Sequence, residues 1–413
     1  MKRTNFAPRV IAAVFLLLLA CLTLSNLGIP LNCARQYLSG ELSFASAMHQ
    51  IVADYQERLT QKEPLLTLNG YYMRLTGARI SNGVVRMTNG MLTEETRKAD
   101  PGYAADQLTG LYRYLQERDT PFLFVEAPRK PGLDGSLMPE GTENHCNENA
   151  DGLLALLEEN NVPFLDLRPE LAGTREALER YYFRTDHHWN DEGAFVAFQR
   201  ITQRIQGQFP GQTVESYVTE RENWEKTTLP DFFLGSHGRR VGIGFAGVED
   251  FFYLTPKFET YLSCSISGDG VYREGSFTEA ALNMERITGE PDYYNSSPYD
   301  VHTGENYAHV RFCNENAPSD KKILMIKDSF GLPVEDFLSA AFREVETLDL
   351  RYLENATAVE MIESIQPDMV IVLYNPFVMS GECLQFGLDG DREKLSPQGN
   401  VWPLKADQYL PPG

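Results

Sequence analysis

The stretch KKILMIKDSFG, residues 321–331, joins an apolar run to a polar turn. The four apolar residues 323–326 predict a strand that is buried on both faces. Asp328 and Ser329 end this run, and helical spacing begins at Val334 in VEDFLSAAFREV. A buried strand followed by a helix is the repeating unit of a parallel α/β sheet.

The same alternation recurs along the chain. Segments with helical periodicity are each followed by a short apolar run, and these runs predict strands at 121–128, 163–167, 345–353 and 367–376. Nearly continuous apolar strands between helices are typical of a parallel sheet covered on both faces. The sequence therefore predicts a three-layer α/β/α fold, whose ligands bind at the carboxyl ends of the strands.

Other segments depart from this rhythm. Residues 43–60 have helical spacing, and Asn69-Gly70 and Asn82-Gly83 predict the turns of β-hairpins within 65–92. The predicted organisation has four parts: a signal anchor at 1–30, a helical stalk with β-hairpins at 31–98, the α/β domain at 99–384 with a partly β insertion at about 210–320, and a C-terminal tail at 385–413. We expect the insertion to form a lid or one wall of a cleft.

The N-terminus has the pattern of an export signal. Lys2, Arg3 and Arg9 precede residues 10–24, which are apolar and carry no charge. Basic residues before such a run orient the positive end towards the cytoplasm. We expect an uncleaved single-pass anchor in the cell membrane with an extracytoplasmic domain; a cleaved signal peptide and a lipoprotein modified at Cys21 are the alternatives.

Charge and cysteine content limit the partners. The formal net charge is −21, which argues against nucleic acid, because phosphate backbones are bound by basic surfaces. A neutral sugar polymer or an acyl donor fits better.

The six cysteines form no CxxC pair, so a zinc ribbon has no support. The last four could form two disulfides or remain free thiols.

Residues 183–193, FRTDHHWNDEG, concentrate chemistry in a short loop. A metal site is one interpretation, but neighbouring histidine side chains diverge, and the spacing matches no established metal motif. A catalytic interpretation requires a base that a carboxylate orients. Asp186 and His188, two residues apart in an extended loop, point to one side, and Ser329 lies where a strand turns into a helix.

Structural roles compete with each of these assignments. Asp and Ser at 328 and 329 are typical caps of a following helix. His188 fits a packed loop histidine, Trp189 fits the core, and Arg351 fits a surface ion pair. Asn190 is predicted to cap the helix DEGAFVAFQRI. The pattern favours a serine-type site and leaves these alternatives open.

Several motifs in order resemble one family, the DHHW family. They are FRTDHHWNDEGA, GSHGRRVG at 235–242, KKILMIKDSFG and LDLRYL at 348–353. The family is similar to the SGNH hydrolase-like proteins that O-acetylate alginate and other bacterial polysaccharides. The resemblance covers about residues 100–380. It implies an SGNH-like three-layer fold and a Ser-His-Asp triad, with no cofactor and no metal.

The resemblance assigns roles to individual residues. It implies Ser329 as nucleophile, His188 as general base and Asp186 as its orienting acid, and it leaves His187 without a role. It also implies that Asn306 contributes to the oxyanion site and that Arg351 lines the substrate site.

This chain departs from the family pattern at two blocks. Lys327 replaces the glycine of the usual Gly-Asp-Ser block, and Gly304-Glu305 replaces Gly-Gly. The serine follows the histidine in the sequence, which implies a circularly permuted motif order.

The sequence thus predicts a membrane-anchored, extracytoplasmic O-acetyltransferase. It would move an acetyl group through Ser329 to a hydroxyl of a bacterial exopolysaccharide or cell-wall glycan. Relatives receive the acetyl group from a multipass membrane O-acyltransferase, so such a partner is implied. The alternatives are a carbohydrate acetylesterase with the same triad, and a non-catalytic glycan-binding or assembly protein.

Overall fold

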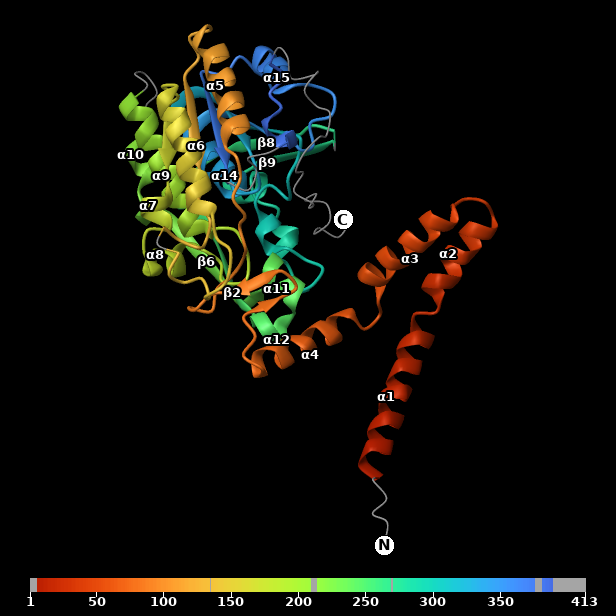
Figure 1. Ribbon diagram of the computed structural model, residues 1–413. Helices are drawn as coiled ribbons and strands as arrows, with labels where there is room; N and C mark the ends of the chain where they lie inside the picture. Colours follow the sequence, from red (N-terminus) through yellow and green to blue (C-terminus); the bar gives the residue numbers. More distant parts are fainter. Residues whose placement is uncertain (1–5, 134, 209–213, 269, 376–380, 389–413) are drawn as a thin grey trace.

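The computed structural model describes residues 6–133, 135–208, 214–268, 270–375 and 381–388 (Figure 1). Its centre is an eight-stranded sheet in the order β5-β4-β13-β11-β12-β10-β8-β9. The first five strands in this order are parallel, and the last three extend the sheet antiparallel. The bounds are β5 Phe164–Asp166, β4 Phe122–Glu126, β13 Met369–Tyr374, β11 Ser319–Lys327, β12 Phe342–Leu348, β10 His309–Asn314, β8 Leu262–Ile266 and β9 Val271–Gly275.

Alternate residues of the parallel strands enter two different cores. In β4, Leu123 and Val125 face one core, whereas Phe122 and Phe124 face the other, as the two-residue period of a strand requires. The helices whose apolar residues enter the Phe122 core are α5 Gly102–Gln116, α6 Cys146–Glu159 and α15 Ala358–Ile365. Those that enter the Leu123 core are α7 Arg168–Leu171, α8 Arg175–Tyr181, α9 Asp191–Gln208, α10 Ser216–Thr219, α13 Phe277–Ala280 and α14 Gly331–Ala341. Helices therefore cover both faces, and the predicted α/β fold with a mostly parallel sheet is confirmed.

The predicted insertion is only partly separate from this sheet. β6 Trp224–Phe233 and β7 Glu249–Pro256 pair as a two-stranded ribbon of their own. In contrast, β8, β9 and β10 continue the central sheet beyond β12. Val310 and Phe312 alternate into the core, so β10 has the pattern of a sheet strand that faces solvent on one side. Short helical pieces lie between these strands: η1 Arg221–Asn223, α11 Ser236–Val241, α12 Ile243–Ala246, η2 Met284–Ile287 and η3 Pro298–Val301.

Residues 65–92 contain one of the predicted turns and lack the other. Asn82 and Gly83 have positive φ and connect the short strands of a small antiparallel sheet. Asn69-Gly70 instead lies inside a helix. Gly70 faces α12, where a Cβ atom would come within 2.5 Å of the Phe245 backbone nitrogen. The glycine permits close helix packing and makes no turn. The elements are α4 Lys62–Leu75, β1 Ile80–Ser81, β2 Val84–Arg86 and β3 Leu92–Glu94.

The N-terminal helices stand apart from the α/β body in Figure 1. They are α1 Phe6–Ser25, α2 Gly28–Leu38 and α3 Phe44–Arg58. Among the described residues, no single helix is long and apolar enough to cross a bilayer; α1 and α2 meet that test only together, as Ala12–Ser25 and Gly28–Leu38, with a 44° bend between them. All six cysteines are free thiols. The chain continues through η5 Gly381–Leu384, and residues 389–413 of the predicted tail lie outside the described residues.

A buried histidine joins three parts of the body that are distant in sequence. His302, after η3, contacts Asp191 at the start of α9 through Nε2 and Asp336 in α14 through Nδ1, each at 2.9 Å. All three side chains are at most 1% exposed. Burial alone would lower the pKa of His302, but the two carboxylates raise it to about 10. His302 is therefore a buried cation at neutral pH, beside Asp191 and beside Asp336, whose own pKa is raised by burial to about 7.

Replacing His302 by Gln should destabilise the fold in a pH-dependent way. The folded pKa of about 10 lies above the ordinary value of 6.5, so the bridge stabilises fully below the ordinary value and loses its effect as pH rises through 10. We expect a loss of about 3–5 kcal/mol in the free energy of unfolding near pH 6, as for a broken buried ion pair. The loss should shrink near pH 10 in urea titrations. His145→Gln, which removes an exposed pair, is the matched control. An equal loss at both pH values would contradict this account.

Candidate active site

The loop that carries Asp186 and His188 is closed by its own backbone. The Phe183 N–H donates to the His188 carbonyl at 3.3 Å, and the Asn190 N–H donates to the Tyr181 carbonyl at 2.8 Å. Lys130, which is buried, donates its Nζ to the Phe183 carbonyl at 3.0 Å. The loop therefore has a fixed path from α8 to α9.

Asp186 is held by three donors. Its Oδ1 accepts from His188 Nδ1 at 2.7 Å and from the His188 N–H at 2.9 Å, and its Oδ2 accepts from the Ser236 N–H at 2.6 Å. Gly235 makes this approach possible, because a Cβ there would lie 2.4 Å from the Asp186 Cβ. Burial alone would raise the pKa of Asp186. His187, His188 and the Ser236 N–H more than offset this effect and hold it well below its usual range.

Ser329 meets the histidine from the other half of the site. It follows β11 and is partly exposed, and its Oγ lies 2.7 Å from His188 Nε2. The turn is held by Asp328, whose two carboxylate oxygens accept from the Phe330 N–H at 2.9 Å and the Asn375 N–H at 2.8 Å. The helix begins at Gly331, and no side chain caps it. The alternative of Ser329 as a helix cap is therefore wrong.

Two further contacts join the halves. Trp189 is fully buried, as predicted, and its Nε1 donates to the Phe330 carbonyl at 3.0 Å. Tyr299 stacks on the His188 ring, with centroids 4.1 Å apart, and its hydroxyl donates to the Ser329 carbonyl at 3.0 Å. Burial and the nearby Asp186 carboxylate raise the pKa of Tyr299 well above its usual range, so the phenol stays a donor. Tyr299 and His302 were not predicted, because neither lies in a recognisable motif.

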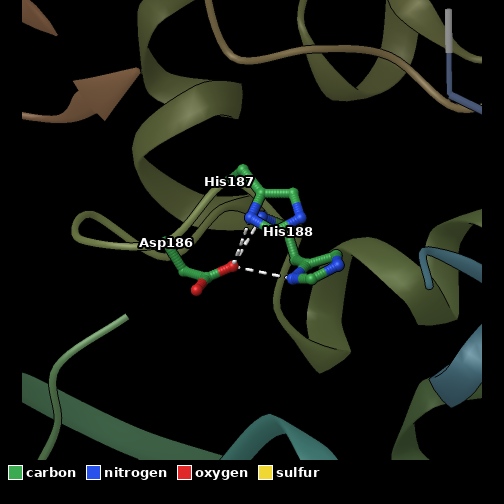
Figure 2. A group of neighbouring side chains, drawn as sticks. All are labelled: Asp186, His187 and His188. Atoms are coloured by element: carbon green, nitrogen blue, oxygen red, sulfur yellow. Dashed lines mark hydrogen bonds and ion pairs between the residues drawn. The ribbon is translucent and has the colours of Figure 1, made fainter. Parts of the chain in front are cut away.

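The paired histidines differ in their surroundings. Figure 2 shows the Asp186 carboxylate beside both rings. His187 is 38% exposed, its Nδ1 lies 3.3 Å from Asp186 Oδ1 and 2.8 Å from Ser236 Oγ, and its ring lies 3.7 Å from the His188 ring. His187 is thus part of the site's wall, whereas His188 alone connects the acid to the serine.

A metal ion would fit the spacing of these three side chains. Asp186, His187 and His188 each offer one ligand atom, and these atoms lie within 4.8 Å of one another. Both ring nitrogens of His188, however, contact Asp186 or Ser329, and both oxygens of Asp186 accept hydrogen bonds. A metal ion here would have to replace these bonds.

The other predicted site residues do not contact the serine. In the described part of the chain, no hydrogen bond joins Asn306 or Arg351 to Ser329. The Asn306 Oδ1 is buried without a hydrogen-bond partner, and Arg351 Nε donates to Asp349 at 2.8 Å. Asn190 does cap α9, since its Oδ1 accepts from the backbone of the first helical turn at 3.1 Å. Lys327 is buried 3.4 Å from Glu335 and does not face the site.

Comparisons with known proteins bear on the fold of the body. Residues 87–237, which contain the Asp186 loop, match the model of the SGNH hydrolase-like domain of acetyltransferase AlgX. No curated protein sequence matches the chain. PatB1 of Bacillus cereus has a similar structure, with a TM-score of 0.61 at 20% identity, over 73% of this chain and 99% of that one. A DHHW family protein of Eubacterium siraeum has a TM-score of 0.53 at 18% identity, over 74% and 94%. The body therefore has an SGNH-like fold, and the resemblance of this chain to the DHHW and SGNH hydrolase-like acetyltransferase proteins is confirmed.

Proposed function

We propose that the protein is an extracytoplasmic O-acetyltransferase that acts on a hydroxyl of a cell-surface glycan. One observation carries the proposal: the unbroken hydrogen-bonded series from Asp186 through His188 to Ser329. Carboxylate, imidazole and hydroxyl in this order are the parts of a serine nucleophile. The match of residues 87–237 to an acetyltransferase domain favours acyl transfer.

The first half-reaction would load the serine. Ser329 Oγ attacks the acetyl carbonyl of the donor while its proton moves to His188 Nε2. Asp186 stabilises the imidazolium that forms and fixes the ring with Nδ1–H towards the carboxylate. The tetrahedral intermediate then breaks its bond to the donor oxygen, which takes the proton from His188. The products are acetyl-Ser329 and the free donor alcohol.

The second half-reaction would transfer the acetyl group. A sugar hydroxyl gives its proton to His188 Nε2 and attacks the acetyl carbonyl, and the ester bond to Ser329 breaks as the serine regains that proton. The negative oxygen needs donors. The Ser329 backbone N–H makes no hydrogen bond within the described residues and can provide one. Asn306 remains our proposal for a second donor, and Arg351 for a substrate contact.

The remaining parts of the proposal concern location and partners. The apolar helices α1 and α2 would anchor the chain once in the cell membrane, with the α/β body outside the cytoplasm. A multipass membrane O-acyltransferase would supply the acetyl group, and a bacterial exopolysaccharide or cell-wall glycan would receive it. The motif order, with the histidine before the serine, would be a circular permutation of the usual one.

Replacement of Ser329 by Ala should abolish turnover of a chromogenic acetyl ester, by about 10³-fold or more, because the attacking oxygen is lost. The full-length protein is assayed with and without an added oligosaccharide, and acetylated sugar is measured by mass spectrometry. Transfer to the sugar supports the acetyltransferase. Hydrolysis without transfer would indicate an esterase, and glycan binding without turnover would indicate a non-catalytic protein.

The same nucleophile should react with a sulfonyl fluoride. A sulfonyl adduct has been observed for PatB1 of Bacillus cereus. We expect one adduct on the peptide that contains Ser329, no adduct there in Ser329→Ala, and normal labelling in Ser39→Ala, a variant far from the site. An unmodified Ser329 in the wild-type protein would contradict an activated serine.

Metal removal should leave the activity unchanged. The nitrogens and oxygens that could hold an ion already form the Asp186–His188–Ser329 series. Acetyl ester hydrolysis after treatment with a strong chelator should therefore equal that of the untreated protein. A loss that zinc or another divalent ion restores would show that the cluster is a metal site.

Tyr299→Phe should lower kcat about 3–10-fold with little effect on KM. The substitution keeps the ring that stacks on His188 and removes only the hydrogen bond to the Ser329 carbonyl, which contributes about 0.5–1.5 kcal/mol. Tyr299→Leu also removes the stacked ring and should lower kcat further. If Tyr299→Phe raised KM alone, the hydroxyl would be a substrate contact and not a positioning group.

A further inference from the structure

One helix of the stalk is apolar on two opposite faces. Leu66, Gly70 and Met73 of α4 lie on the face that packs against the α/β body through α12. This contact joins backbones directly: a Cβ at Gly244 of α12 would lie 2.1 Å from the Thr67 carbonyl oxygen.

The open side of α4 is a stripe of large apolar residues. The exposed fractions are 66% for Leu68, 62% for Tyr72 and 88% for Leu75, and Leu65 and Tyr71 are 38% and 58% exposed. The spacing of 65, 68, 72 and 75 places these side chains along one helix face. A groove of about 430 Å³ lies at the junction of α4 and the body, where Leu68 and Tyr71 line it together with Tyr294. Exposed apolar surface of this kind marks an interaction site.

The rest of the stalk continues this surface towards the N-terminus. Leu16 and Leu17 of α1 are 64% and 65% exposed, Leu38 at the end of α2 is 81% exposed, and Phe44 of α3 is 65% exposed. Figure 1 shows that the chain passes from α3 directly into α4, the helix that lies beside α12. The apolar surface of α4 is therefore continuous in the chain with the segment that has the composition of a membrane anchor.

Charge also separates this edge from the rest of the protein. Residues 31–80, which follow the apolar segment, contain five Lys and Arg against four Asp and Glu, whereas residues 81–413 contain 29 against 54. An anionic membrane surface would therefore repel the body and would not repel residues 31–80. Tyrosine beside leucine, with Lys62 and Arg74 at the ends of α4, is also typical of a helix in the interface between lipid headgroups and acyl chains.

We propose that the Leu65, Leu68, Tyr72 and Leu75 face of α4 lies in the surface of an anionic lipid bilayer. The helix would then fix the orientation of the whole body, because α4 packs against α12. α12 follows α11 in the chain, and Ser236, the first residue of α11, donates its N–H to Asp186. The candidate active site is thereby connected to the membrane through two short helices. A membrane-embedded acyl donor would approach the serine from this side, a consequence that depends on the proposed function.

Lipid photolabelling of the full-length chain tests this proposal. The protein is placed in nanodiscs of phosphatidylcholine and phosphatidylglycerol, one chain to a disc, with a phospholipid that carries a diazirine in its acyl chain. Trypsin releases the α4 segment as the peptide Glu63–Arg74, and mass spectrometry measures its lipid adducts. We expect adducts on this peptide and on α1, and none on the peptide that contains Tyr272, whose side chain is as exposed as that of Tyr72.

The double variant Leu68→Glu and Tyr72→Glu should lose the α4 adducts at least tenfold and keep those on α1. Thermal unfolding checks that it folds, and hydrolysis of a water-soluble acetyl ester should be unchanged. Absence of α4 adducts in the wild-type protein, with α1 labelled, would overturn the proposal. Cross-links of α4 between isotopically different copies in multi-chain discs, without lipid adducts in single-chain discs, would assign this face to a second copy. Ester hydrolysis in the same samples reports on the proposed function separately.

Discussion

The arrangement of the site depends on a buried cation between two acids. His302 joins Asp191, which begins the helix after the histidine loop, to Asp336, which lies in the helix after the serine. Separating His302 from either acid would leave a buried charge without its partner, which is costly in a low-dielectric interior. The bridge therefore joins α9 and α14, the helices that follow His188 and Ser329 in the chain. Trp189 and Tyr299 add neutral links of the same kind, since each donates a hydrogen bond across the boundary between the two halves.

Backbone proximity sets the second constraint. Gly235 lies so close to Asp186 that a side chain at position 235 would collide with it. The N–H of the next residue, Ser236, donates a hydrogen bond to Asp186 Oδ2. The two adjacent histidines have different hydrogen-bond partners. His188 lies between the acid and the serine, and His187 is left at the surface of the site beside Ser236. The position of Asp186 in the DHHW stretch therefore depends on Gly235 and Ser236 in the GSHGRRVG stretch, although almost fifty residues separate the two stretches.

Much of this could be predicted from the sequence, and the remainder has identifiable causes. The apolar runs of β4, β11 and β13 predicted the parallel sheet, because two-sided burial leaves a continuous hydrophobic signal. The two-residue spacing of Asp186 and His188 and the strand-to-helix position of Ser329 predicted which side chains the fold brings together. The turn predicted at Asn69-Gly70 was wrong, because the sequence does not distinguish a glycine that permits close helix packing from a glycine in a turn. β8 to β10 lie in the segment for which the sequence predicts an insertion, because their alternating pattern does not indicate which strand they pair with. Tyr299 and His302 contact partners 30 or more residues away, and no local sequence pattern indicates such contacts.

The order of strands in the sheet has a consequence for how the protein matures. In the sheet, β4 lies between β5, which has three residues, and β13. β5 follows β4 closely in the chain, whereas β13 is made some 240 residues after β4. An N-terminal segment that emerges first must hold an incomplete sheet with an open edge until the last strands arrive, and such edges invite pairing with other chains. The histidine half of the site exists throughout this interval without its serine. A chain interrupted before β11 would lack Ser329, and a chain interrupted after α14 would carry Ser329 without β13, the strand that lies beside β11. The candidate site therefore depends on strands that are made late in synthesis.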